Sequence, residues 1–74
     1  MSQLITLLPV DDSWVVRSSH LARELPFRSG AQAETTARRI AAETAREGRP
    51  ATLEIYLRDG SLAGRILYSA AAAA

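Results

Sequence analysis

The chain has 74 residues, so it forms one domain at most and can bury only a small hydrophobic core. It contains no cysteine, which excludes disulfide bridges and thiolate metal sites. The net charge of +1 excludes an acidic DNA mimic and gives no overall attraction to nucleic acid or to anionic membranes.

The first part of the chain predicts two strands and an edge segment. Residues 4–8 form a short apolar run that stops at Pro9, and residues 14–18 are rich in β-branched and aromatic side chains. The polar residues between these two runs favour a turn, so we expect a hairpin. Residues 21–27 alternate large and small or polar side chains, but Pro26 has no N–H to donate. This third segment is therefore predicted to be an edge strand or an extended connection.

Residues 30–47 predict a helix with a signal at each end. Ser29 and Gln32 have the spacing of a capping box, and Gly48 followed by Pro50 marks the stop. The predicted inward face has mostly small side chains at helical spacing: Ala33, Ala37, Ile40, Ala41 and Thr44. A face this small lets the helix backbone approach a sheet closely.

Residues 52–68 predict an antiparallel hairpin centred on Asp59-Gly60. Apolar and polar residues alternate on both sides of this pair, and Asp-Gly favours a type I′ turn with positive φ at both central residues. Alternation sends one set of side chains toward the helix: Leu53, Ile55, Leu57, Leu62 and Ile66. The predicted core of the domain consists of Trp14, Ile40, Leu53, Ile55 and Leu62.

These elements predict an α+β fold, with an antiparallel four- to five-stranded sheet and one α-helix packed on one face, in the order β-β-(β)-α-β-β. The single domain is expected to span residues 1–69, and residues 70–74 are expected to be a disordered or frayed alanine tail. The N-terminus lacks the features of a signal peptide, and no stretch has the length of a membrane span. We therefore expect a cytoplasmic protein without membrane contact.

Several short motifs follow one another along nearly the whole chain. They are Pro9, Trp14-Val15-Val16-Arg17, Phe27, Ala37-Arg38-Arg39-Ile40-Ala41, Gly48, Leu53-Glu54-Ile55, Asp59-Gly60-Ser61-Leu62 and Tyr68. In order and spacing, this set resembles a small bacterial and phage family catalogued as domain of unknown function 2188. The resemblance implies a prokaryotic or phage origin and the architecture given above, but it supplies no catalytic residues.

The residue types that carry catalysis are not arranged for it. His20 is the single histidine and lies in a predicted turn beside two serines, without the converging base and carboxylate that nucleophilic catalysis requires. Asp11 and Asp12 are interpreted as turn residues, because Ca²⁺ needs six or more oxygen ligands from a structured loop. Glu34 and Glu43 lie on opposite sides of the helix and cannot act as a carboxylate pair. We expect no enzyme activity, cofactor, metal ion or small-molecule substrate.

The sheet face that the helix leaves uncovered is the main candidate site. Alternation and the Asp-Gly turn place aromatic, basic and aliphatic side chains on it: Val15, Arg17, Tyr56, Arg58, Arg65 and Leu67. Tyrosine and arginine are enriched at protein interfaces, and they also stack on and pair with single-stranded nucleic acid. An ordinary solvated sheet face is the third interpretation. A second basic feature, Arg38, Arg46 and Arg49, lies on the outer side of the helix between glutamates and is interpreted as solvated.

The sequence therefore favours a small non-enzymatic binding module with a protein partner. Its sharper form is a phage or mobile-element inhibitor of a host defence complex, in the manner of anti-CRISPR proteins. A nucleic-acid-binding domain that uses the uncovered sheet face is the first alternative, and a bacterial accessory protein of unknown role is the second. Because the large apolar side chains are few, we also expect a homodimer, formed through the uncovered face or an edge strand.

Overall fold

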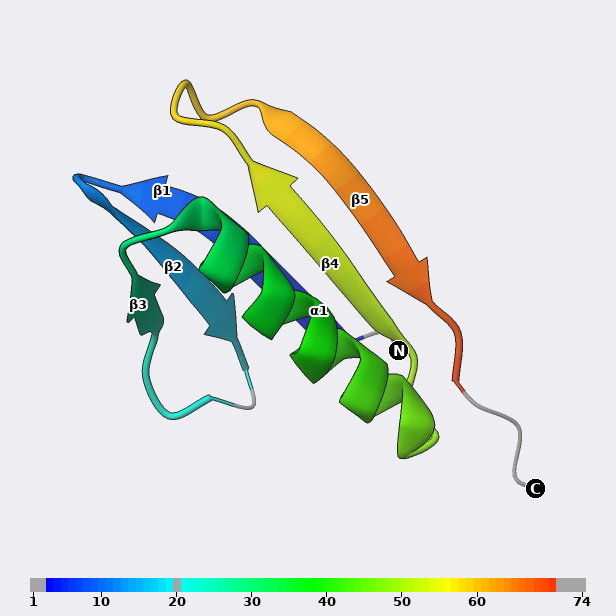
Figure 1. Ribbon diagram of the computed structural model, residues 1–74. Helices are drawn as coiled ribbons and strands as arrows, with labels where there is room; N and C mark the ends of the chain where they lie inside the picture. The colour runs from blue at the N-terminus through cyan, green and yellow to red at the C-terminus, as the bar shows by residue number, and fades with distance from the viewer. Residues whose placement is uncertain (1–2, 20, 71–74) are drawn as a thin grey trace.

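The computed structural model describes residues 3–19 and 21–70, which form five strands and one helix (Figure 1). The strands are β1 (Gln3–Val10), β2 (Ser13–Ser18), β3 (Leu25–Phe27), β4 (Ala51–Tyr56) and β5 (Leu62–Tyr68). Helix α1 (Gly30–Arg46) connects β3 to β4. The predictions made for His20 and for tail residues 71–74 lie outside the described residues.

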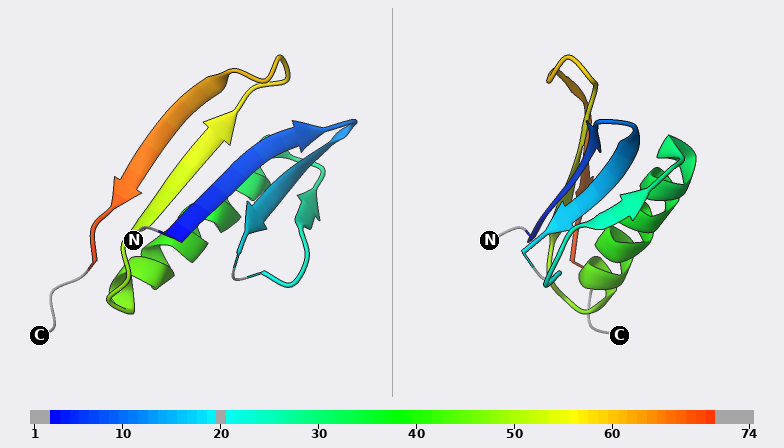
Figure 2. Two further views of the ribbon diagram at one scale, coloured as in Figure 1. Left: turned by 180° about the vertical axis from the view of Figure 1, so that it is seen from behind. Right: turned by 90° about the vertical axis from the view of Figure 1, so that its left-hand side faces the viewer.

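The five strands form one sheet in the order β3-β2-β1-β4-β5, and α1 packs on one of its faces (Figure 2). This confirms the α+β class, the single helix on one face and the predicted sequence of elements. Three of the four strand pairs are antiparallel, whereas the central β1–β4 pair is parallel. A parallel pair needs a long crossover connection, and here that connection contains β2, β3 and α1.

Both ends of α1 have caps at the predicted residues, with one of the two hydrogen bonds of the predicted capping box at Ser29. The hydroxyl of Ser29 accepts a hydrogen bond from the backbone N–H of Gln32 at 3.3 Å, which satisfies one free donor of the first turn. At the other end, Gly48 has φ 91°, and its N–H donates to the carbonyl of Ala45 at 3.0 Å. The N–H of Arg49 donates to the carbonyl of Thr44 at 3.1 Å, which completes a Schellman motif.

The β4–β5 hairpin is confirmed, but its turn differs from the predicted type I′. The N–H of Gly60 donates to the carbonyl of Leu57 at 3.0 Å, so Arg58 and Asp59 are the central residues of the turn. Gly60 has φ 88°, whereas Asp59 does not have positive φ. The Asp59 carboxylate accepts hydrogen bonds from the N–H and hydroxyl of Ser61, at 2.9 and 2.6 Å. The aspartate therefore holds the chain after the turn, and only the glycine needs the left-handed conformation.

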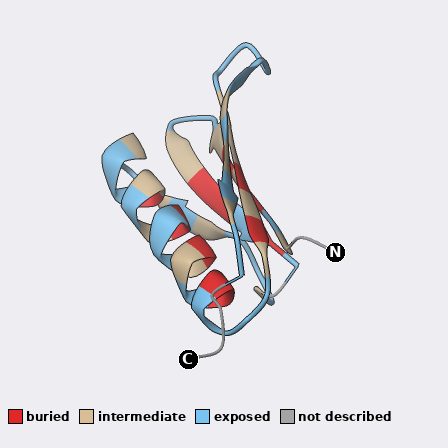
Figure 3. Ribbon diagram, turned by 90° about the vertical axis from the view of Figure 1, so that its right-hand side faces the viewer, coloured by how far each residue is buried: buried red, intermediate tan, exposed pale blue. Residues whose placement is uncertain are grey.

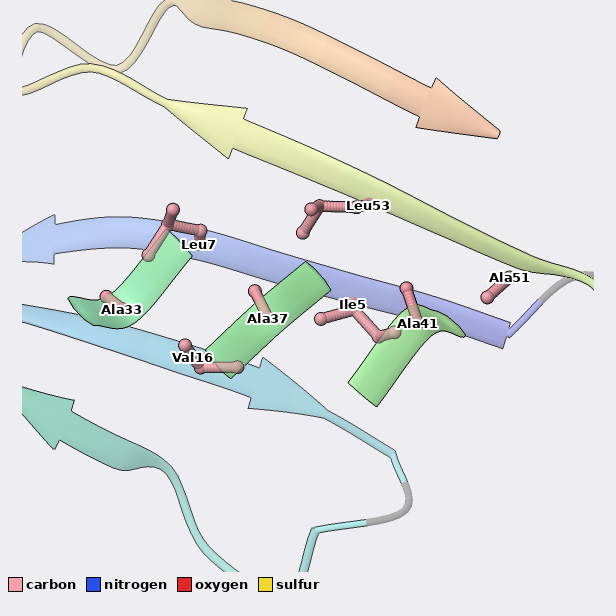
Figure 4. Close-up of a cluster of buried hydrophobic side chains, with 8 residues drawn as sticks. All are labelled: Ile5, Leu7, Val16, Ala33, Ala37, Ala41, Ala51 and Leu53. Carbon is pink, nitrogen blue, oxygen red and sulfur yellow. The ribbon is translucent and has the colours of Figure 1, made fainter. Parts of the chain in front are cut away.

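The core lies between α1 and the three central strands (Figures 3 and 4). The largest fully buried side chains are those of Ile5, Leu7, Val16 and Leu53. They contact a helix face whose fully buried members are Ala33, Ala37 and Ala41. Because these helix side chains are single methyl groups, the sheet supplies nearly all the apolar volume.

The predicted core is partly confirmed. Leu53 is fully buried, while Trp14, Ile40 and Ile55 are half-buried and pack at the margin of the cluster. A Cβ on Gly30 would lie 3.1 Å from Cε2 of Trp14, so the start of α1 packs closely on the indole ring.

The inward orientation predicted for Leu62 and Leu57 is wrong. The β4–β5 register shifts between Ile55 and Tyr56, which lie opposite Gly64 and Leu62 respectively. This irregularity moves Leu62 to the same face as Tyr56, away from α1, and leaves it 43% exposed. Leu57 is 48% exposed because β4 has already ended at Tyr56.

Candidate functional site

In the described part of the chain, no helix or strand packs on the sheet face opposite α1 (Figure 2). We call this surface the open face. The strand registers and the alternation of side chains assign to it Leu4, Thr6, Leu8, Val15, Arg17, Thr52, Glu54, Tyr56, Leu62, Arg65 and Leu67. Five of the six residues predicted for the partner-binding surface therefore lie on one side of the sheet.

A carboxylate that the sequence analysis did not single out organises the middle of the open face. Glu54 accepts hydrogen bonds from Nε and Nη2 of Arg65, at 3.0 and 2.8 Å, and from the hydroxyl of Tyr56 at 2.9 Å. The bonds from Arg65, and then that from Tyr56, hold the pKa of the Glu54 carboxyl below its ordinary value. The same carboxylate raises the pKa of the Tyr56 hydroxyl. Two of the predicted binding residues are thus fixed by one acidic partner.

The second arginine on the open face is also paired. Nε and Nη2 of Arg17 in β2 contact the carboxylate of Glu24, which precedes β3. Each of the two arginines in the strands of the open face therefore has an acidic partner. The charges of these two arginines are compensated.

Arg58 extends from the β4–β5 turn toward the β1–β2 turn. Its Nη1 donates to the backbone carbonyl of Asp11 at 2.7 Å, and its guanidinium carbon lies 5.8 Å from the centre of the Trp14 ring. Among the described residues, no carboxylate forms an ion pair with Arg58. This predicted residue therefore lies at one end of the open face rather than within it.

An open hollow of about 400 Å³ lies where the β4–β5 turn approaches β1. Its lining includes the apolar side chain of Leu8, the ring of Tyr56 and the two arginines Arg17 and Arg58. Because Glu24 already pairs with Arg17, the uncompensated positive charge beside the apolar lining is that of Arg58, an arrangement suited to an apolar side chain that is followed by an acidic group.

Large apolar side chains are exposed on either side of the Glu54 network. Leu4, Leu62 and Leu67 are 48%, 43% and 73% exposed, and all three belong to the open face. Val15, in contrast, is only 6% exposed, because it lies in β2 between Leu8 of β1 and Pro26 of β3. The predicted binding residue Val15 therefore lies beneath this surface and supports it.

The basic stripe on α1 is interrupted by acidic partners. Nε of Arg38 donates to Glu34 at 3.0 Å, and this bond raises the pKa of Arg38. Arg49 forms an ion pair with Glu47, and Arg46 lies exposed in the last helical turn. Exposed pairs of this kind contribute little to stability, and they reduce the positive charge that the stripe offers to a partner.

Within residues 3–19 and 21–70, no group of three or more histidine or acidic side chains is placed to hold a metal ion. A second hollow, of about 480 Å³, lies beside α1 and is lined by Phe27, Gln32, Thr35 and Arg39, among others. No helix in the described part of the chain has both the length and the apolar character needed to cross a bilayer.

Some residues of the candidate site could have been found from the sequence and others could not. Glu54 faces Arg65 across the hairpin, so an explicit register would have revealed this pair. The exposure of Leu62 depends on the register shift beside Tyr56, which has no clear sequence signal. Leu4 joins the surface because β1 pairs with β4, a contact between distant parts of the chain.

No family model, no curated protein and no solved structure matches this chain. The resemblance to domain of unknown function 2188 therefore stays a prediction.

Proposed function

We propose that this protein is a non-enzymatic binding module that contacts a protein partner through the open face. The observation that carries the proposal is the exposure of Leu4, Leu62 and Leu67 on a sheet face that no described element covers. The three leucines are separated by Thr52 and by the Glu54 network, but with Tyr56 and Arg65 they give one face the combination of apolar, aromatic and arginine side chains that is typical of interaction sites. Exposure of these leucines to water is unfavourable, and a partner that covers them would remove this cost.

The charges favour a protein partner over nucleic acid. Arg17 and Arg65 each form an ion pair within the sheet, so their charges are already compensated. Nucleic-acid affinity comes largely from lysines and arginines that neutralise phosphates, which requires an excess of positive charge. Protein interfaces instead combine an apolar centre with tyrosine, arginine and a polar rim.

The hollow beside Tyr56 offers an anchoring position for such a partner. Binding energy at protein interfaces concentrates in a few apolar or aromatic side chains that fill pockets. Leu8 and Tyr56 give this hollow an apolar lining, and Arg58 adds a positive rim. We therefore infer a partner segment that presents an apolar side chain next to an acidic residue. In the finer prediction, the protein inhibits a host defence complex, and a protein of that complex is the partner.

The experiment compares an open-face variant with a helix-face variant. Tyr56→Ala combined with Leu62→Ala removes the hollow lining and an exposed leucine, whereas Thr35→Ala combined with Arg39→Ala changes the outer side of α1. A partner that co-purifies with the wild type should be lost from the first variant and kept by the second. Circular dichroism verifies that both variants are folded.

Two outcomes contradict the proposal. One is retention of the partner by the open-face variant at the wild-type level. The other is retention of labelled DNA or RNA that falls steeply with salt, which would favour the nucleic-acid alternative. For the finer prediction, the readout is loss of target cleavage by a purified host defence complex, with the same two variants as comparison.

A further inference from the structure

Strand β5 has an exposed edge and no buried residue. It is last in the sheet order, and in the described part of the chain it pairs only with β4 (Figure 1). None of its seven residues is buried, although four of them are large and apolar: Leu62, Ile66, Leu67 and Tyr68. An edge strand of this composition presents unpaired backbone groups together with apolar side chains, which favours pairing with another strand.

The opposite edge of the sheet is protected against such pairing. Strand β3 has three residues and contains Pro26, which cannot donate a backbone hydrogen bond. Strand β5 is more than twice as long and contains no proline. Its single charged residue is Arg65, whose charge is compensated by Glu54 of the same sheet. The usual devices that prevent edge pairing are thus present along β3, whereas β5 has only the irregularity near its start, opposite Ile55 and Tyr56.

We propose that β5 pairs antiparallel with β5 of a second copy of this chain, about a two-fold axis perpendicular to the sheet. This interaction uses the free edge of β5, whereas the proposed partner binding uses the open face; the side chains of Arg65 and Leu67 belong to both surfaces. The two-fold axis passes between the two β5 strands, so one residue of β5 lies opposite its own copy. Each pair of facing residues lies on the same side of the sheet. Both helices then lie on the same side of a continuous sheet.

Three registers are worth comparing, centred on Arg65, Ile66 or Leu67. Centring on Arg65 would place two arginines directly opposite each other, and like charges in that position are destabilising. Centring on Leu67 would bring Ser69, beyond the end of the strand, opposite Arg65. The register centred on Arg65 therefore loses electrostatic energy, and the register centred on Leu67 loses strand pairing.

The register centred on Ile66 avoids both problems. It pairs Ile66 with its own copy, Arg65 with Leu67, and Gly64 with Tyr68. An aromatic ring opposite a glycine in a strand is a favourable combination. This register also uses only the part of β5 that follows the irregularity opposite Ile55 and Tyr56. The structure therefore points to Ile66 as the centre of the contact.

The expected dimer is weak and reversible. A single strand-to-strand contact buries less than the roughly 1,200 Å² of a standard stable interface. Backbone hydrogen bonds along the edge supply the affinity, and the alternate side chains supply the register. The dimer should therefore be populated at high protein concentration and dissociate on dilution.

Cross-linking tests the register directly, because the chain has no native cysteine. Single variants Arg65→Cys, Ile66→Cys and Leu67→Cys are oxidised at high concentration, and Ala31→Cys on the exposed start of α1 is the control. Opposing residues in an antiparallel pair have Cα atoms about 4.5–5.5 Å apart, which a disulfide can span. Ile66→Cys should give the most disulfide dimer. A maximum at 65 or 67 would overturn the register, and yields no higher than that of Ala31→Cys would overturn the pairing.

A charge substitution at an exposed position provides a second test, in which the monomer stays folded. Leu67 is 73% exposed, so Leu67→Arg and Leu67→Glu should both leave the monomer folded. In the proposed register, Leu67→Arg faces Arg65 of the second copy twice per dimer, whereas Leu67→Glu does not add a like charge opposite it. By sedimentation equilibrium, the dissociation constant should rise several-fold more for Leu67→Arg than for Leu67→Glu. Equal effects of the two variants, or a wild type that stays monomeric at millimolar concentration, would contradict the proposal.

Discussion

The strands on the two sides of β4 are stabilised by different kinds of interaction. On one side, β1 and β2 share the buried cluster with α1, and Ile5, Leu7 and Val16 are almost fully enclosed. On the other side, β5 has no buried residue and is joined to the rest by its β4 ladder, by half-buried Ile66 and Tyr68 and by the Glu54 network. The same sheet therefore contains a centre stabilised by packing and an edge strand stabilised mainly by hydrogen bonds and charge.

The strongest test of this difference makes the same substitution, leucine to alanine, in the buried core and in the edge strand. Leu53→Ala should reduce the free energy of unfolding by about 2–5 kcal/mol, because it removes buried methyl groups and leaves a cavity. Leu67→Ala should change it by no more than about 0.5 kcal/mol, because that side chain is 73% exposed. Urea unfolding at low protein concentration measures both. Similar losses for the two leucines would mean that β5 belongs to the cooperative core.

A second pair of substitutions separates backbone strain from packing in the β4–β5 hairpin. A new Cβ at Gly60 or at Gly64 would have no atom within 4 Å, but only Gly60 has positive φ, at 88°. Gly60→Ala should therefore cost about 1–2 kcal/mol, whereas Gly64→Ala should be neutral or slightly stabilising. We expect the loss to appear first as faster amide hydrogen exchange in β5. Unchanged exchange in β5 with uniformly faster exchange in β1 would contradict the independent behaviour of the edge strand.

Low pH should destabilise β5 more than the centre of the sheet. We expect this effect to be smaller than those of the substitutions above. The pKa of Glu54 is lowered below its ordinary value of 4.5 by the bonds from Arg65 and Tyr56. Its contribution to stability is therefore complete above that ordinary value and is lost as the pH falls through the lowered pKa. Between about pH 6 and pH 3, the wild type should lose more stability than Glu54→Gln. Asp59, whose pKa is also lowered, titrates in both proteins and cancels in the comparison. Equal pH dependence would show that the carboxylate does not hold β5.

Local sequence signals predicted the local structure well. The Ser29 cap, the Gly48 stop and the hairpin around Gly60 each depend on a few neighbouring residues, and the structure contains all three. The alternation of side chains also placed Leu53, Ile55 and Ile66 correctly on the side that faces α1, but not Leu57 and Leu62. Such features are encoded by residues close in sequence, so composition and spacing are sufficient to recognise them.

The remaining features depend on contacts that no local pattern contains. The parallel β1–β4 pair, which places Ile5 and Leu7 at the centre of the core, joins segments far apart in the chain. The irregularity at Ile55 and Tyr56 reverses the orientation of Leu62, and alternation alone cannot locate it. At the candidate site, the same limits explain why the surface was recognised while Leu4, Leu62 and the role of Glu54 were missed.

The parallel pairing of β1 with β4 also has a consequence for how quickly the protein can fold. The β1–β2 and β4–β5 hairpins join neighbouring segments and can form within microseconds. The central contact, from Gln3 opposite Ala51 to Leu7 opposite Ile55, requires closure of the whole segment that contains β2, β3 and α1. Contacts between such distant residues slow folding, because the entropy of closing the loop is lost before the contact is formed. The rate-limiting step should therefore be the meeting of two preformed hairpins beneath the helix.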